Sequence, residues 1–154
     1  VLTPENLFTS GIEGPAVDKS GTIYAVNFNR QGTIGEVTPN GVAGLFIQLP
    51  EGSTGNGIRF NSEGNMLIAD YTGHNILKVD MKTSQITVLA HEPDMNQPND
   101  IAIDEKDRIY ASDPDFKLKK GQSGGLKIIK FFYWIQCRGQ QTELKSVRII
   151  KYYM

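Results

Sequence analysis

The sequence predicts an all-β chain, part of a β-propeller built from four-stranded antiparallel blades. Two observations lead to this fold class: a pattern that recurs every 43 residues without a gap, and short apolar segments separated by turn-forming residues within each copy. Four-stranded repeats of roughly 40–45 residues are typical of propellers. A β-sandwich is the alternative all-β architecture, but a sandwich does not explain a strict period.

The repeat is defined by three segments of similar sequence that begin at Glu13, Asn56 and Asn99. The register then persists through three further sets of equivalent positions, namely Asp18, Asn61 and Asp104, then Gly21, Gly64 and Asp107, and then Asn27, Asp70 and Asp113. Three copies of one such pattern are hard to attribute to chance. They predict three blades, at about residues 12–50, 55–92 and 98–130.

Each copy opens with an apolar strand, a four-residue turn and a second apolar strand. The turns beginning at Asp18, Asn61 and Asp104 hold the residue types that tight connections need. The first copy continues with strands predicted at residues 33–37 and 42–49, and the second copy follows the same plan. The residues of segment 23–26 are all apolar or aromatic, although alternate side chains point to opposite faces. Neighbouring blades are therefore expected to cover both faces of each sheet.

The pattern fails in the third copy. A third strand is predicted at residues 124–128, but the turn found in the first two blades is replaced by an aromatic segment from Lys130 onward. We therefore place the end of the partial propeller at residue 130 and treat residues 131–154 as an irregular, basic and aromatic tail. Truncation, a shifted reading frame and an unrelated extension all stay open as its origin.

Charge is distributed unevenly along the 154 residues. Residues 1–116 hold seven Lys and Arg against 16 Asp and Glu, whereas residues 117–154 hold nine against one. An acidic body suits cation binding. The basic tail has neither helical periodicity nor a nucleic-acid motif, and no apolar run approaches the roughly 20 residues of a membrane helix, so neither partner is expected. The single cysteine, Cys137, excludes an internal disulfide and leaves the compartment open.

Three equivalent residues form the candidate metal site. The first strand of each propeller blade lines the central channel, so Glu13, Asn56 and Asn99 are expected to face one another. One carboxylate and two amides are hard oxygen donors of the kind that Ca²⁺ or Mg²⁺ prefers, and the absence of His and Cys argues against zinc or copper. For Asn56, which lies between two glycines, a plain turn role is the alternative.

Two short motifs carry a resemblance to a known family. Glu13-Gly14-Pro15 and, two blades later, Pro98-Asn99-Asp100 resemble the Glu-Gly-Pro and Pro-Asn-Asp motifs of the gluconolactonase and senescence-marker-protein (regucalcin) family. The resemblance covers about residues 10–130. It implies a six-bladed propeller of which this chain holds about three blades, a divalent cation that is most often Ca²⁺, and hydrolysis of lactones or related esters.

The resemblance implies that Glu13 is a direct metal ligand and that Asn99 lies beside metal or substrate, while Asn56 matches the repeat alone. We assign Glu13, Asn56 and Asn99 to the metal and Asp100 and Asp113 to a small lactone or ester substrate. The family's general base lies in later blades, so no catalytic residue is assigned and this chain alone is expected to be inactive. The alternatives are a non-catalytic propeller that binds a protein or small ligand, and a related alkaloid-condensing enzyme. Uncovered blade faces also predict self-association.

Overall fold

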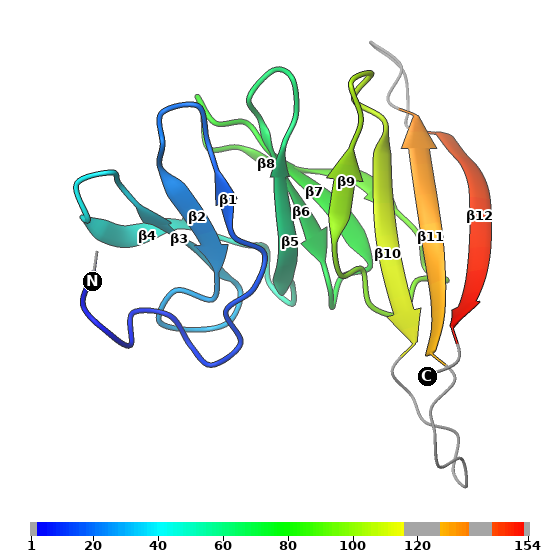
Figure 1. Cartoon of the computed structure of the whole chain (residues 1–154), viewed down its shortest axis with the longest axis horizontal. Helices are drawn as coiled ribbons and strands as arrows, with labels where there is room; N and C mark the ends of the chain where they lie inside the picture. Colours follow the sequence, from blue (N-terminus) through cyan, green and yellow to red (C-terminus); the bar gives the residue numbers. More distant parts are fainter. Residues whose placement is uncertain (1–2, 116–126, 136–142, 153–154) are drawn as a thin grey trace, which may run out of the picture.

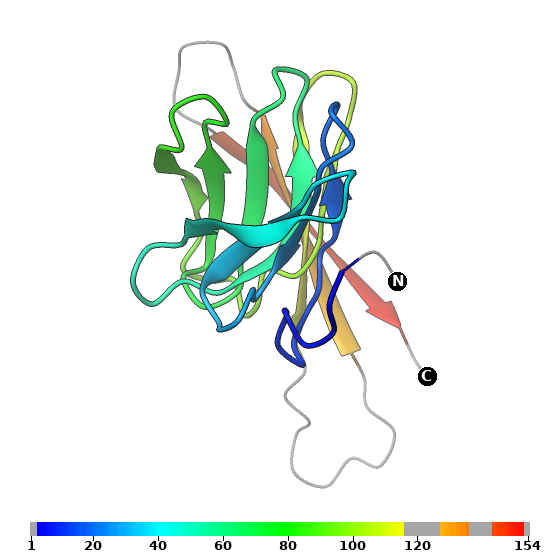
Figure 2. The same ribbon diagram turned by 90° about the vertical axis from the view of Figure 1, so that its left-hand side faces the viewer.

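Every regular element in the described part of the chain is a β-strand, which confirms the predicted fold class. The computed structural model describes residues 3–115, 127–135 and 143–152. Its strands form three four-stranded antiparallel sheets, which Figure 1 shows side by side as propeller blades. Figure 2 looks onto the first blade, with the second and third behind it. No helix capable of crossing a membrane occurs among these residues.

The first two blades are simple meanders in which each strand pairs with the next strand along the chain. Blade 1 contains β1 (Ala16–Val17), β2 (Ile23–Val26), β3 (Thr33–Val37) and β4 (Ala43–Gln48). Blade 2 contains β5 (Gly55–Phe60), β6 (Met66–Asp70), β7 (Asn75–Val79) and β8 (Ile86–His91). The innermost strands β1 and β5 come from equivalent positions of the repeat.

The third blade extends further than the sequence indicates. It contains β9 (Ile101–Ile103), β10 (Ile109–Asp115), β11 (Lys127–Ile135) and β12 (Glu143–Tyr152). We placed the end of the propeller at residue 130, whereas β11 continues past it and β12 pairs along β11 within residues 131–154. Backbone hydrogen bonds make such a ladder, and they do not require the turn residues on which the boundary was based. Cys137 lies outside the described residues.

The predicted equivalence of three turns is confirmed. In each turn the Oδ1 atom of the first residue accepts a hydrogen bond from the backbone N–H four residues on. These bonds are Thr22 N to Asp18 at 3.0 Å, Asn65 N to Asn61 at 2.8 Å and Arg108 N to Asp104 at 3.0 Å. The same side chain therefore closes the same turn in all three blades.

The fourth position of the turn has a positive φ in every blade, 86° at Gly21, 83° at Gly64 and 56° at Asp107. Glycine adopts this conformation without steric cost, whereas aspartate does so less readily. Asp107 has a second contact that the glycines lack, because its carboxylate accepts hydrogen bonds from the backbone N–H (2.9 Å) and the hydroxyl of Ser62. This side chain joins the turns of blades 2 and 3.

The turn carboxylates predict a pH dependence of stability. Burial raises the pKa of Asp18, but hydrogen bonds from Ser20 and Thr22 outweigh it and hold the pKa below 3.8. Burial also raises the pKa of Asp104, and hydrogen bonds from Arg108 and Lys106 again bring it below 3.8. Because the folded pKa lies below the unfolded value, this stabilisation is present above about pH 4 and is lost as the pH falls through the folded pKa.

Asn61 makes the same turn with an amide that does not titrate, which supplies a matched control. The double variant Asp18→Asn/Asp104→Asn is expected to lose less stability than the wild type between about pH 5 and pH 2.5. Asn61→Asp is expected to steepen the acid decline. Urea unfolding midpoints measured across this range test both statements, and parallel curves for all three proteins would contradict them.

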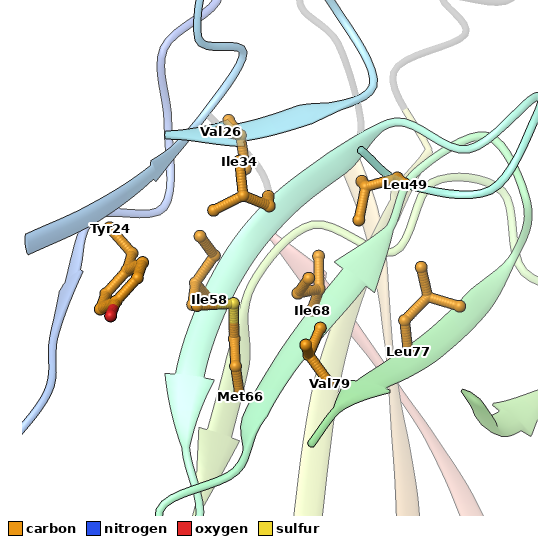
Figure 3. Close-up of a cluster of buried hydrophobic side chains, with 9 residues drawn as sticks. All are labelled: Tyr24, Val26, Ile34, Leu49, Ile58, Met66, Ile68, Leu77 and Val79. Atoms are coloured by element: carbon orange, nitrogen blue, oxygen red, sulfur yellow. The ribbon is translucent and has the colours of Figure 1, made fainter. Parts of the chain in front are cut away.

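In the part of the chain whose side chains are described, the hydrophobic core consists of two clusters separated by the sheet of blade 2. Figure 3 shows the first cluster, between blades 1 and 2, formed by Tyr24, Val26, Ile34, Leu49, Ile58, Met66, Ile68, Leu77 and Val79. The second lies between blades 2 and 3 and contains Leu67, Ala69, Ile76, Met95, Ile101, Ile109 and Ala111. All five residues of β6 are buried. The strand alternates between the two clusters, so the prediction that both faces are covered is confirmed for blade 2.

Candidate functional site

A pocket of about 320 Å³ lies where the innermost segments of the three blades meet. It is lined by Glu13, Gly14 and Pro15 from blade 1, by Asn56, Gly57 and Arg59 from blade 2, and by Asn99 and Asp100 from blade 3. The three residues selected as equivalent positions of the repeat, Glu13, Asn56 and Asn99, thus reach one pocket. Its volume is that of a small-molecule site, and five of its eight lining residues have polar or charged side chains.

Glycines allow the innermost segments to approach each other closely. The Gly57 N–H donates a 2.7 Å hydrogen bond to the carbonyl oxygen of Asn99 in the next blade. A Cβ on Gly57 would lie 2.9 Å from that oxygen. Gly14 is the equivalent residue of blade 1. It has a φ of +58°, and a Cβ there would overlap the carbonyl oxygen of Asn56. The backbone of each candidate asparagine therefore packs directly against a glycine of the preceding blade.

The side chains of Glu13, Asn56 and Asn99 make no hydrogen bond or ion pair with any residue of the described part. Glu13 is exposed, and the two asparagines are half-buried. In the described part of the chain, no three His, Cys, Asp or Glu side chains are grouped so that they could hold a metal ion. The donors at this pocket are therefore a carboxylate and amide oxygens, a set that suits Ca²⁺ better than a transition metal.

Asp100 lies in the pocket, as expected of a substrate-binding candidate, and forms an ion pair with Arg59. The Nη2 atom of Arg59 lies 3.0 Å from Oδ1 and 3.2 Å from Oδ2 of Asp100. Both side chains are partly exposed, at 40% for Arg59 and 58% for Asp100. Arg59 Nη1 also donates a 2.7 Å hydrogen bond to the carbonyl oxygen of Ile58. The pocket therefore contains one paired carboxylate, Asp100, and one without a cationic partner, Glu13.

Sequence reasoning did not select Arg59. Regular strand alternation would place Asn56 and Arg59 on opposite faces of β5, because they are three residues apart. The pairing of β5 with β6 shifts register between Gly55 and Ile58, and such a bulge redirects the side chains beside it. Both residues consequently line the pocket. The repeat did contain one indication that Arg59 is special, because the other two blades have alanine, Ala16 and Ala102, at the equivalent position.

Asp113 lies outside the lining of this pocket. Its carboxylate is fully buried and accepts hydrogen bonds from the backbone N–H groups of Asn96 (2.8 Å) and Gln97 (2.6 Å). These residues belong to the loop that leads to Asn99. The contacts hold that loop in place and leave Asp113 no exposed surface for a ligand.

The equivalent residues of the other blades hold the equivalent loops. Asp70 accepts a 3.1 Å hydrogen bond from the Thr54 N–H, and Asn27 donates one of 2.7 Å from Nδ2 to the carbonyl oxygen of Gly11. Gly11 and Thr54 are related by the same 43-residue offset. This position of the repeat thus connects the end of the second strand to the segment that carries the pocket residue.

Comparisons with known proteins agree with this architecture. The family model described as the SMP-30/gluconolactonase/LRE-like region matches residues 11–145. A gluconolactonase of Zymomonas mobilis subsp. mobilis is 24% identical over 148 residues, which cover 85% of this chain and 42% of that protein.

Among solved structures, a gluconolactonase of Xanthomonas campestris matches with a TM-score of 0.69 at 16% identity, over 91% of this chain and 49% of its own. The calcium-binding protein regucalcin of Agrobacterium tumefaciens matches with a TM-score of 0.59 at 19% identity, over 91% of this chain and 44% of its own.

These likenesses confirm the propeller fold, and the chain spans less than half the length of each of the three relatives. The family model extends beyond the two short motifs from which the resemblance was inferred, and it covers most of the chain. It confirms that resemblance. The chain belongs to the SMP-30/gluconolactonase/LRE-like family.

Proposed function

We propose that the pocket holds a divalent cation, most favourably Ca²⁺, through the Glu13 carboxylate and the amide oxygens of Asn56 and Asn99. The observation that carries this proposal is the meeting of three equivalent polar side chains, free of protein partners in the described part, in one pocket. Three oxygens are part of the six to eight that Ca²⁺ takes. Water, substrate and other protein groups complete the set.

Glu13 has the central role because Arg59 neutralises the other carboxylate. The Asp100 oxygens are engaged by the guanidinium at 3.0 and 3.2 Å. Glu13 has no such partner among the residues that the structure describes, and it supplies the negative charge that attracts a cation. Asn56 and Asn99 add neutral donors, and the tight packing of their backbone fixes the points from which their side chains project.

We further propose that the complete protein hydrolyses a lactone or a related ester, as the gluconolactonase relatives suggest. When bound, the cation polarises the substrate carbonyl toward attack by water. The residues of this chain hold the cation and form one wall of the substrate site. Hydrolysis of δ-gluconolactone that disappears with a chelator and returns with Ca²⁺ would support the activity, and turnover unaffected by the chelator would exclude a metal-dependent mechanism.

Glu13→Gln tests the cation site directly. The substitution keeps the size of the side chain and removes its charge, so we expect Ca²⁺ affinity to fall about tenfold or more. Calorimetric titration with Ca²⁺ measures the effect. Glu51→Gln is the matched control, because Glu51 is exposed and lies outside the pocket lining, and its affinity should equal that of the wild type.

Equal Ca²⁺ affinity for Glu13→Gln and the wild type would remove Glu13 from the site. Binding of Ca²⁺ and of a polyol acid by the complete protein, without hydrolysis of any lactone or ester, would instead favour the alternative of a non-catalytic binding propeller. The fold hosts both kinds of function, so these measurements decide between them.

A further inference from the structure

The ion pair between Arg59 and Asp100 is a departure from the repeat. At the position of Arg59 the other two blades have Ala16 and Ala102. At the position of Asp100 they have Gly14 and Gly57, both of which lie against the backbone of a neighbouring blade. Blade packing at these positions is thus achieved elsewhere with small residues. Two opposite charges have been introduced at one point only, and that point is the pocket wall.

A purely structural role explains this pair poorly. Both side chains are partly exposed, and ion pairs that water reaches contribute little to stability because water screens them. The β-bulge between Gly55 and Ile58 also turns Arg59 into the pocket together with Asn56. The geometry therefore suits a residue that meets a ligand.

Arg59 retains hydrogen-bonding capacity after its protein contacts are counted. A guanidinium has five N–H donors, and the contacts to Asp100 and Ile58 engage only Nη2 and Nη1. Among the described residues, the pocket contains two carboxylates, those of Glu13 and Asp100, against one guanidinium. With a divalent cation bound, these groups and the cation together have a net charge of +1. Such a site attracts anions.

We propose that Arg59 binds an anionic group of the substrate, a carboxylate or a phosphate ester distant from the lactone, so that the pocket selects acidic over neutral sugar lactones. This inference rests on the proposed cation site and adds the class of substrate. Arginine suits the task because its planar fork matches the oxygens of carboxylate and phosphate. Asp100 is a positioning residue, which orients the guanidinium toward the pocket.

The test measures binding by calorimetry to the 154-residue chain loaded with Ca²⁺. D-Gluconate has only the carboxylate released by lactone opening, D-glucarate adds a second carboxylate, and 6-phospho-D-gluconate adds a phosphate. We expect the wild type to bind at least one of the two probes with a second anionic group more tightly than it binds gluconate. Arg59→Gln should lower its affinity for that probe about tenfold or more, and its affinity for gluconate less than twofold.

Two further variants sharpen the result. Arg59→Lys keeps the charge but loses the fork, so its affinity should fall between the wild type and Arg59→Gln, and it serves as the test if Arg59→Gln does not fold. Arg30→Gln is the matched control. Arg30 is exposed, lies outside the pocket and contacts Gln48 at 2.6 Å, so its affinities should equal those of the wild type.

A titration with Ca²⁺ alone separates the two proposals. If the wild-type chain does not bind Ca²⁺, the proposed cation site is wrong. If Ca²⁺ binding is intact but the wild type and Arg59→Gln bind glucarate and 6-phosphogluconate with equal affinity, the proposed role of Arg59 is wrong. The role is also wrong if the wild type prefers gluconate or binds none of the three probes. Preference for glucarate assigns the carboxylate, and preference for the phosphate probe assigns the phosphate.

Discussion

Replacing Gly57 by alanine is expected to destabilise the chain and to weaken the cation site. The added Cβ would lie 2.8 Å from Oδ1 of Asp100 and 2.9 Å from the carbonyl oxygen of Asn99. Because one of these neighbours is backbone, the inner strands must separate. Overpacking of this kind costs about 1–3 kcal/mol, which lowers the melting temperature by several degrees. We also expect Ca²⁺ affinity to fall, since Asn56 and Asn99 flank the displaced backbone.

Gly44→Ala is the control for this experiment. Gly44 lies in β4, no atom lies within 4 Å of the position of its missing Cβ, and its φ is not in the left-handed region. The same chemical change should there alter stability by no more than about 0.5 kcal/mol and leave Ca²⁺ binding unchanged. Thermal unfolding and calcium titration of both variants give the comparison. Similar melting temperatures for the two would mean that the contact at Gly57 is easily relieved.

Asp113→Ala is expected to have the second large effect. The substitution leaves the half-buried backbone N–H groups of Asn96 and Gln97 without the buried carboxylate that accepts from them. A donor left without its acceptor costs about 1–3 kcal/mol, so the two donors together are expected to lower the free energy of unfolding by about 3 kcal/mol. The freed loop leads directly to Asn99, and cation affinity should therefore decline even though Asp113 lies outside the pocket.

Two variants test whether these hydrogen bonds are the cause. Both N–H groups donate to Oδ1, and Asn96 N–H also donates to Oδ2 at 3.0 Å. Asp113→Asn keeps one acceptor oxygen for them but places an NH₂ group at the other position, so its stability should lie between Asp113→Ala and the wild type. Glu51→Ala removes an exposed carboxylate that makes no hydrogen bond with the described residues, and its stability should stay within about 0.5 kcal/mol of the wild type. Urea unfolding measures all three. An Asp113→Ala protein as stable as Glu51→Ala would refute the structural role.

Features that depend on local chemistry and on the repeat could be predicted from the sequence. The turn at Asp18, Asn61 and Asp104 is closed by one side chain and nearby backbone, so residue type at one position suffices to identify it. The meeting of Glu13, Asn56 and Asn99 follows from propeller geometry, because equivalent positions of adjacent blades lie side by side around one axis.

Features that depend on how particular strands and loops contact one another could not be predicted. Arg59 reaches the pocket because of a bulge in β5, and the local residue pattern does not predict this bulge. Asp113 and Asp70 occupy the same position of the repeat, but only the structure shows that both carboxylates face inward and hold a loop. The strands β11 and β12 are joined by backbone ladders, whose formation the aromatic and basic residues of that region do not reveal.

The division of the core by blade 2 has a consequence for cooperativity. Each cluster joins one pair of neighbouring blades, and none of the described side chains belongs to both. The molecule therefore behaves as a short one-dimensional array, in which loss of either outer blade exposes one face of the middle sheet. Strand β6, with all five residues buried, participates in both interfaces and opens only when the whole array does. Its amide hydrogens should exchange with solvent last, and the order of exchange outward from β6 records the order in which the blades separate.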